Sequence, residues 1–86
     1  MELTEYRQEL DKIDREIVRL FVQRMEISSR IGAWKLQENM SVFQPERERQ
    51  KLETLLSEAP AELHESIAAL YGEIFALSRK QQLKAQ

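Results

Sequence analysis

Five polar side chains lie at positions where the helical pattern of the sequence would place apolar residues. They are Arg24, Lys35, Glu48, Ser78 and Gln82. A guanidinium or ammonium group can hold a carboxylate, and hydroxyl, amide and carboxylate groups can fix the orientation of a bound molecule. If the helices carry these side chains into one bundle core, the sequence predicts a pocket for a small anionic ligand.

The helical period decides which of these side chains share a face. Arg24 takes a core step of the first apolar stripe, and Lys35 follows eleven residues later, about three turns on and on nearly the same face. Glu48 lies one turn before the inward leucines of a second helix. The serine and the glutamine continue the stripe that Tyr71 and Phe75 form on a third helix.

Each residue also has a plainer explanation. Arg24 could be a core arginine that pairs with a carboxylate or extends its charge to solvent. Lys35 could be a solvated helix lysine, and Glu48 could belong to a surface charge network. Ser78 and Gln82 could be polar residues near a fraying helix end. The binding interpretation rests on all three helices placing polar groups on inward faces.

The first of the three helices is unusually long. Apolar residues at alternating steps of three and four predict a helix over residues 3–37. Gly32 lies inside this pattern at a cost of about 1 kcal/mol relative to alanine, but the stripe resumes beyond it. The stripe consists of Leu3, Tyr6, Leu10, Ile13, Ile17, Leu20, Ile27, Ile31 and Trp34.

The rest of the chain predicts two shorter helices. Residues 38–43 break the period, and Pro45 suits the first turn of a helix over residues 45–57. The break at Ala59-Pro60 precedes a helix over residues 61–83. No strand pattern and no repeat appears, so the predicted fold class is all-α.

The length of the first helix bears on assembly. About 35 residues in a helix span roughly 50 Å, whereas a compact domain of this size is about 30 Å across. The remaining residues cannot cover the whole stripe, which predicts an intertwined helical-bundle homodimer. The alternative is a helix that bends near Gly32 or folds back as a monomeric bundle.

Composition narrows the class of protein. The 86 residues are 42% hydrophobic and 33% charged, which predicts one soluble domain over residues 1–86. A net charge of −2 argues against nucleic acid or an anionic membrane as a partner. The absence of cysteine and the single histidine argue against a structural zinc site. No apolar run is long enough for a membrane span or a signal peptide, so a cytoplasmic location is expected.

At these residues the chain resembles the helical (AroQ-class) chorismate mutases over nearly its whole length. The matching positions are Arg7, Ile13-Asp14, Leu20, Arg24, Ile31-Gly32-Ala33-Trp34-Lys35, Pro45-Glu46-Arg47-Glu48, Ser78 and Gln82. The resemblance implies rearrangement of chorismate to prephenate in aromatic amino-acid biosynthesis (the shikimate pathway). This pericyclic reaction requires no acid, base, nucleophile, metal or cofactor. The enzyme must orient a dianion and stabilise charge that develops on its ether oxygen.

The resemblance also implies roles for the arginines and the glutamate. Arg24 would grip one substrate carboxylate, and Arg7 would reach across the dimer to the other or share it. Arg47 would support the site by fixing Glu48 and a carboxylate. Glu48 would accept a hydrogen bond from the ring hydroxyl.

The remaining site residues would contact the ether oxygen and other parts of the substrate. Lys35 and Gln82 would donate to the ether oxygen, and Ser78 would make a lesser contact to a carboxylate. Gln44 departs from the family, because some members carry an acidic residue there. The change is harmless if this position acts through its backbone N–H.

Helix geometry constrains where Arg7 can act. It precedes Arg24 by 17 residues, which is an offset of about 100° and roughly 25 Å along the helix. One helix cannot point both side chains at one substrate, so Arg7 must come from a second copy.

Two other functions remain open. An isochorismate-pyruvate lyase would share this scaffold and a similar anion pocket. A non-catalytic helical dimerisation or regulatory module would have a stripe that is apolar throughout, without Arg24 or Glu48 in it.

Overall fold

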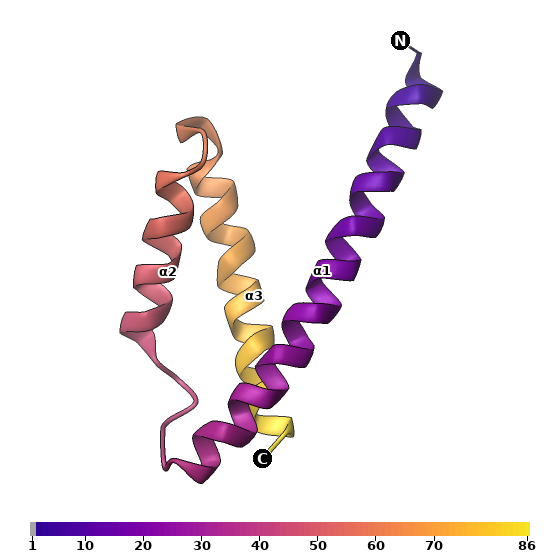
Figure 1. Cartoon of the computed structure of the whole chain (residues 1–86). Helices are drawn as coiled ribbons and strands as arrows, with labels where there is room; N and C mark the ends of the chain where they lie inside the picture. Colours follow the sequence, from indigo (N-terminus) through magenta and orange to yellow (C-terminus); the bar gives the residue numbers. More distant parts are fainter. Residues whose placement is uncertain (1) are drawn as a thin grey trace.

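The structure, a computed structural model, describes residues 2–86 as three helices and one short 3-10 turn (Figure 1). The elements are α1 (Leu3–Gln37), α2 (Pro45–Ser57), η1 (Ala61–Leu63) and α3 (His64–Lys84). The described residues contain no strand, so the predicted all-helical class is confirmed. The third helix differs in detail from the prediction. Its first turn is a 3-10 turn that follows Pro60.

The three helices form an open arrangement that measures 54 × 25 × 15 Å (Figure 1). α2 and α3 run side by side as a hairpin, and α3 crosses the C-terminal half of α1. The N-terminal half of α1 projects away from both of them (Figure 1), and every residue from 2 to 20 is exposed.

A specific turn ends α1 and directs the chain into α2. Asn39 has a φ of 54°, a left-handed conformation that asparagine tolerates. The Met40 N–H donates to the Lys35 carbonyl at 2.8 Å, and the Asn39 N–H donates to the Leu36 carbonyl at 3.3 Å. This pair of bonds is the Schellman pattern of helix ends. It places the loop of residues 38–44 beside the last turn of α1.

α1 and α3 cross at very short range because small residues meet there. A Cβ added to Gly32 would lie 2.3 Å from the Gln82 carbonyl oxygen and 2.6 Å from its Cα. One turn earlier, the Ser28 and Ser78 hydroxyl oxygens lie 2.5 Å apart in a hydrogen bond. Gly32 therefore has a packing role, since any larger residue would separate the two helices.

The buried positions of residues 2–86 are polar or small, and no large apolar side chain among them is buried. Each residue of the apolar stripe on α1 is at least 41% exposed. Soluble chains seldom leave such a continuous apolar surface uncovered. The helices of one chain thus leave most of the stripe without a packing partner.

None of the helices described is both long and apolar enough to cross a bilayer.

Candidate active site

A cavity of about 570 Å³ opens between the C-terminal half of α1, the loop of residues 38–44, α2 and α3. Its walls include seven of the eight residues that the sequence predicts for the site: Arg24, Lys35, Gln44, Arg47, Glu48, Ser78 and Gln82. Three helices and one loop thus bring together side chains that are up to 58 positions apart in the sequence.

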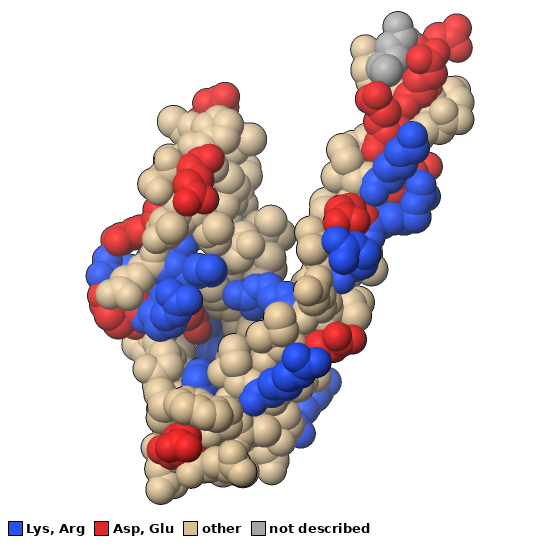
Figure 2. All heavy atoms as spheres, in the orientation of Figure 1, with Lys and Arg blue, Asp and Glu red and all other residues tan. Residues whose placement is uncertain are grey.

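The cavity is strongly cationic. Among residues 2–86, its walls carry five cationic side chains and a single carboxylate, that of Glu48. Figure 2 shows Lys and Arg side chains gathered around the hollow between α1 and the α2–α3 pair. A small dianion would therefore enter a region of favourable potential.

Lys35 lies at the centre of a hydrogen-bond group. Its ammonium donates to Gln82 Oε1 at 2.8 Å and to the Val42 carbonyl at 2.8 Å. An ammonium has three donor hydrogens, and an amide whose oxygen accepts still has two N–H donors. Lys35 and Gln82 therefore keep donors available for an oxygen atom of a ligand.

The environment of Lys35 also changes its acidity. Burial lowers the pKa of Lys35, and the charge of Glu48 opposes that effect. A bound anion would reverse the balance by favouring the charged ammonium.

Arg24 is half-buried on the α1 wall. Its guanidinium carbon lies 5.8 Å from the centroid of the Phe75 ring, within reach of a cation–π contact. Within residues 2–86 Arg24 forms no ion pair, so its charge has no carboxylate partner among these residues.

Glu48 is held by a residue that the sequence analysis missed. The Arg79 Nη1 donates to both Glu48 carboxylate oxygens at 2.7 Å. The same guanidinium lies over the Phe43 ring, 5.0 Å from its centroid. Arg79 follows Phe75 by one helical turn, and that spacing could have placed it on the inward face.

Lys51 is a second cavity residue that the sequence analysis missed. It follows Glu48 by three residues and Arg47 by four, so it shares their face of α2.

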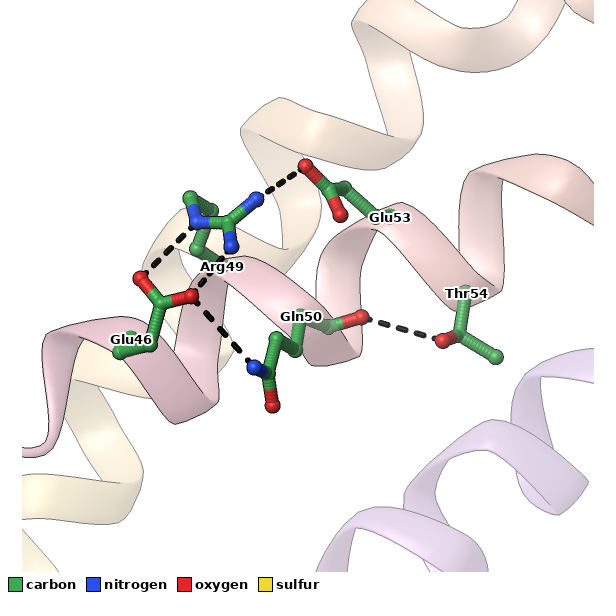
Figure 3. Close-up of polar contacts among 5 residues, drawn as sticks. All are labelled: Glu46, Arg49, Gln50, Glu53 and Thr54. Carbon is green, nitrogen blue, oxygen red and sulfur yellow. Dashed lines mark hydrogen bonds and ion pairs between the residues drawn. The ribbon is translucent and has the colours of Figure 1, made fainter.

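The charged run at the start of α2 divides between two faces. Figure 3 shows Arg49 paired with Glu46 and Glu53. Gln50 Nε2 also donates to Glu46, at 3.4 Å. These side chains are exposed, whereas Glu48 points into the cavity. Glu48 is thus not part of the surface charge network that the sequence left open as an alternative.

Ser78 and Gln44, which line the cavity, each have a hydrogen-bond partner within the chain. The Ser78 hydroxyl is bonded to Ser28, and Gln44 Nε2 donates to the Ser41 carbonyl at 2.9 Å. The Gln44 side chain therefore stabilises the loop before α2, and the Ser78 hydroxyl bridges α1 and α3.

Arg7 is the one predicted site residue that a single chain does not bring to the cavity. It lies on the exposed, projecting half of α1. The cavity therefore lacks Arg7 unless another copy supplies it.

The comparisons with known proteins bear on the chemistry of this cavity. The sequence profile of the family described as chorismate mutase type II matches residues 6–83. The bifunctional chorismate mutase/prephenate dehydratase of Aquifex aeolicus (strain VF5) is 46% identical over 55 residues, which cover 64% of this chain and 15% of that protein. The T-protein of Haemophilus influenzae is 39% identical over 57 residues, which cover 66% of this chain and 15% of that protein. No solved structure matches the chain significantly.

Proposed function

This chain belongs to the chorismate mutase type II family, and from that membership we propose that it is an isomerase that converts chorismate to prephenate. The observation that carries the proposal is the cationic cavity in which Lys35 and Gln82 keep hydrogen-bond donors available. The chain spans about 15% of the length of the two relatives, so their further activities are not carried over to it.

The first task of the cavity is to orient the substrate. Chorismate carries two carboxylates and a flexible enolpyruvyl arm that must fold over the ring. Arg24 offers a guanidinium without an ion-pair partner in residues 2–86, which suits a bidentate grip on a carboxylate. Arg47, which lines the same cavity, would assist with a carboxylate. Holding the ring carboxylate and the carboxylate of the arm at the same time turns a flexible molecule into a near-attack conformer.

The second task is to stabilise charge on the ether oxygen as the C–O bond breaks. The remaining Lys35 hydrogen and the Gln82 amide are the donors proposed for that oxygen. Because Lys35 holds Gln82 Oε1, the amide nitrogen is the part of the side chain left to face the substrate. Such preorganised donors are each worth roughly 2.7–4 kcal/mol at a charge-developing oxygen.

We further propose that two chains form an intertwined homodimer. The uncovered apolar stripe of α1 and the lack of a large buried apolar side chain in residues 2–86 support this assembly. A second α1 lying along the first would cover the stripe. It would also carry Arg7 of one copy toward the cavity of the other, where it would bind a carboxylate.

The remaining parts of the proposal come from the sequence and its resemblance to the family. Residues 1–86 would act as one catalytic domain in the cytoplasm, and the reaction would need no cofactor. Glu48 would accept from the ring hydroxyl, and Ser78 would contact a carboxylate.

The test is to add the purified chain to chorismate and to isochorismate separately. We expect the absorbance of chorismate to fall as prephenate forms. Pyruvate released from isochorismate would instead identify a lyase, and no turnover of either would identify a non-catalytic module.

Arg24 provides the matched variants for that assay. Arg24→Ala should lower turnover by about 100-fold or more, because a carboxylate loses its partner. Arg24→Lys should regain little, since an ammonium cannot make the bidentate contact. Near-normal turnover in Arg24→Lys would show that only net charge matters at this position.

A further inference from the structure

Arg79 joins three elements at the edge of the cavity. Its Nη1 donates to both oxygens of Glu48 on α2, and its guanidinium carbon lies over the ring of Phe43 in the loop before α2. Its own backbone belongs to α3. The Arg79 and Glu48 side chains are only 31% and 23% exposed, so this pair is not a solvated surface bridge.

Glu48, the single carboxylate that lines the cavity among the described residues, is stabilised by this contact. Glu48 is close enough to Lys35 for its charge to oppose the lowering of the lysine pKa. Without Arg79, this carboxylate is free to pair with the Lys35 ammonium, which lines the same cavity. That contact would consume the donor that the ether oxygen requires.

The geometry leaves Glu48 able to bind a ligand. An ionised carboxylate has about four lone-pair positions, and one Arg79 nitrogen occupies a single position on each oxygen. A hydroxyl group that approaches from the cavity can still donate to either oxygen.

We propose that Arg79 is a positioning residue that holds the Glu48 carboxylate as the acceptor for the substrate's ring hydroxyl and keeps it apart from Lys35. The inference rests on the proposed chorismate mutase function. It makes the Glu48–Arg79 pair, rather than Glu48 alone, the unit that recognises the hydroxyl.

The test is a double-mutant cycle measured with chorismate on Arg79→Met, Glu48→Gln and the double variant. Methionine keeps an apolar stem against Phe43 while removing the charge. We expect Arg79→Met to lower kcat/KM by about tenfold or more, mostly through kcat, since the misplaced carboxylate disables Lys35. In the Glu48→Gln background the same change should cost less than about threefold.

Two further variants separate positioning from other effects. Arg79→Lys should recover part of the loss, because an ammonium still attracts Glu48. Arg49→Met removes an exposed ion-paired arginine from the outer face of α2 (Figure 3) and should leave turnover unchanged. Circular dichroism and thermal unfolding of each variant at equal concentration would separate a loss of fold from a loss of positioning.

Three results would overturn the inference while leaving the proposed function intact. The first is that the losses in kcat/KM caused by Arg79→Met and Glu48→Gln multiply in the double variant, as they would if the two residues acted independently. The second is a rise in KM at unchanged kcat in Arg79→Met, which would make Arg79 itself a carboxylate ligand. The third is a rate loss that follows only the fraction unfolded. Absence of chorismate turnover in the unmodified protein would overturn both proposals.

Discussion

Lys35 has two opposing influences on its charge, and their balance predicts a pH dependence. Burial lowers the pKa of the folded-state ammonium, whereas in the unfolded chain a lysine titrates near 10.4. Between those two values the unfolded state binds more protons, so folding stability rises with pH through this alkaline window. Catalysis needs the protonated Lys35 ammonium. Activity should therefore be lost over the same alkaline pH range in which the folding stability rises.

We expect kcat/KM to fall at alkaline pH, at a pH below the pKa of an ordinary lysine. The alkaline fall in kcat should lie at a higher pH than the fall in kcat/KM, because the bound dianion favours the charged Lys35 ammonium. Lys35→Arg should remove the alkaline fall, since arginine stays protonated. If kcat/KM stayed constant up to the pKa of a free lysine, this result would contradict the role given to Lys35.

Gln82 provides a second test at the scale of one side chain. Its amide does not titrate near neutrality, so the unmodified protein should depend little on pH below 7. Gln82→Glu replaces the donor by a carboxyl group that donates only when protonated, with an ordinary pKa of about 4.3. At pH 7 the carboxylate would pair with Lys35 and repel the developing charge. We expect turnover to be poor at neutral pH and to recover as the pH falls toward about 5 or below.

The neighbouring glutamine is a matched control for that change. Gln81 donates to the Ser29 hydroxyl at 2.8 Å and does not line the cavity. Gln81→Glu should therefore leave the pH–rate profile unchanged. Overlapping profiles for the unmodified protein and Gln82→Glu would remove Gln82 from the mechanism.

At the scale of the elements, the crossing of α1 and α3 makes a prediction about two glycines. Gly32→Ala gains up to about 1 kcal/mol of helix propensity, but its Cβ would lie 2.3 Å from the Gln82 carbonyl oxygen. The helices must separate, which displaces Gln82 and Ser78. We expect a lower melting temperature together with a loss of turnover.

Gly72→Ala is the control for helix propensity, because an added Cβ there meets no atom of residues 2–86 within 4 Å. This variant should melt at the same or a higher temperature and keep its activity. If Gly32→Ala behaved like Gly72→Ala, the close crossing would not be required for the site.

The sequence and the structure agree where one periodicity governs a long segment. The apolar stripe predicts α1 over residues 3–37 because its step of three and four residues continues past Gly32. Pro45 predicts the start of α2 because its missing N–H and fixed φ suit a first turn. Most of the fold could therefore be predicted.

Features that depend on contacts between elements were not predictable in this way. From the sequence alone, the visible effect of Gly32 is a lower helix propensity. Its missing Cβ lets α3 approach closely, and that benefit depends on the position of the α3 backbone. Arg79 was missed because its partners lie on α2 and on the loop before it. The left-handed turn at Asn39 depends on two carbonyls of the last turn of α1.

At the scale of the whole molecule, the exposed half of α1 predicts an obligatory partner. We expect a dimer by sedimentation, and dilution should reduce helicity and activity together. Ile17→Glu places a charge on the uncovered stripe, where Ile17 is 58% exposed in the single chain. This variant should shift the protein to monomer and remove turnover.

Arg15→Glu introduces the same side chain on the other face of α1, about 200° around the helix from Ile17. It should remain dimeric and active. A fully active monomer, in either variant or in the unmodified protein, would remove the shared site and with it the role of Arg7.

The uncovered stripe has a consequence for how the protein reaches its native state. With no large apolar side chain buried in residues 2–86, one chain alone gains little from collapse. On the proposed assembly, the encounter of two chains is then the step in which most apolar surface leaves water. Refolding should therefore follow second-order kinetics, and its half-time should lengthen as the protein is diluted. The melting temperature should fall with dilution for the same reason, since folding and association are a single equilibrium.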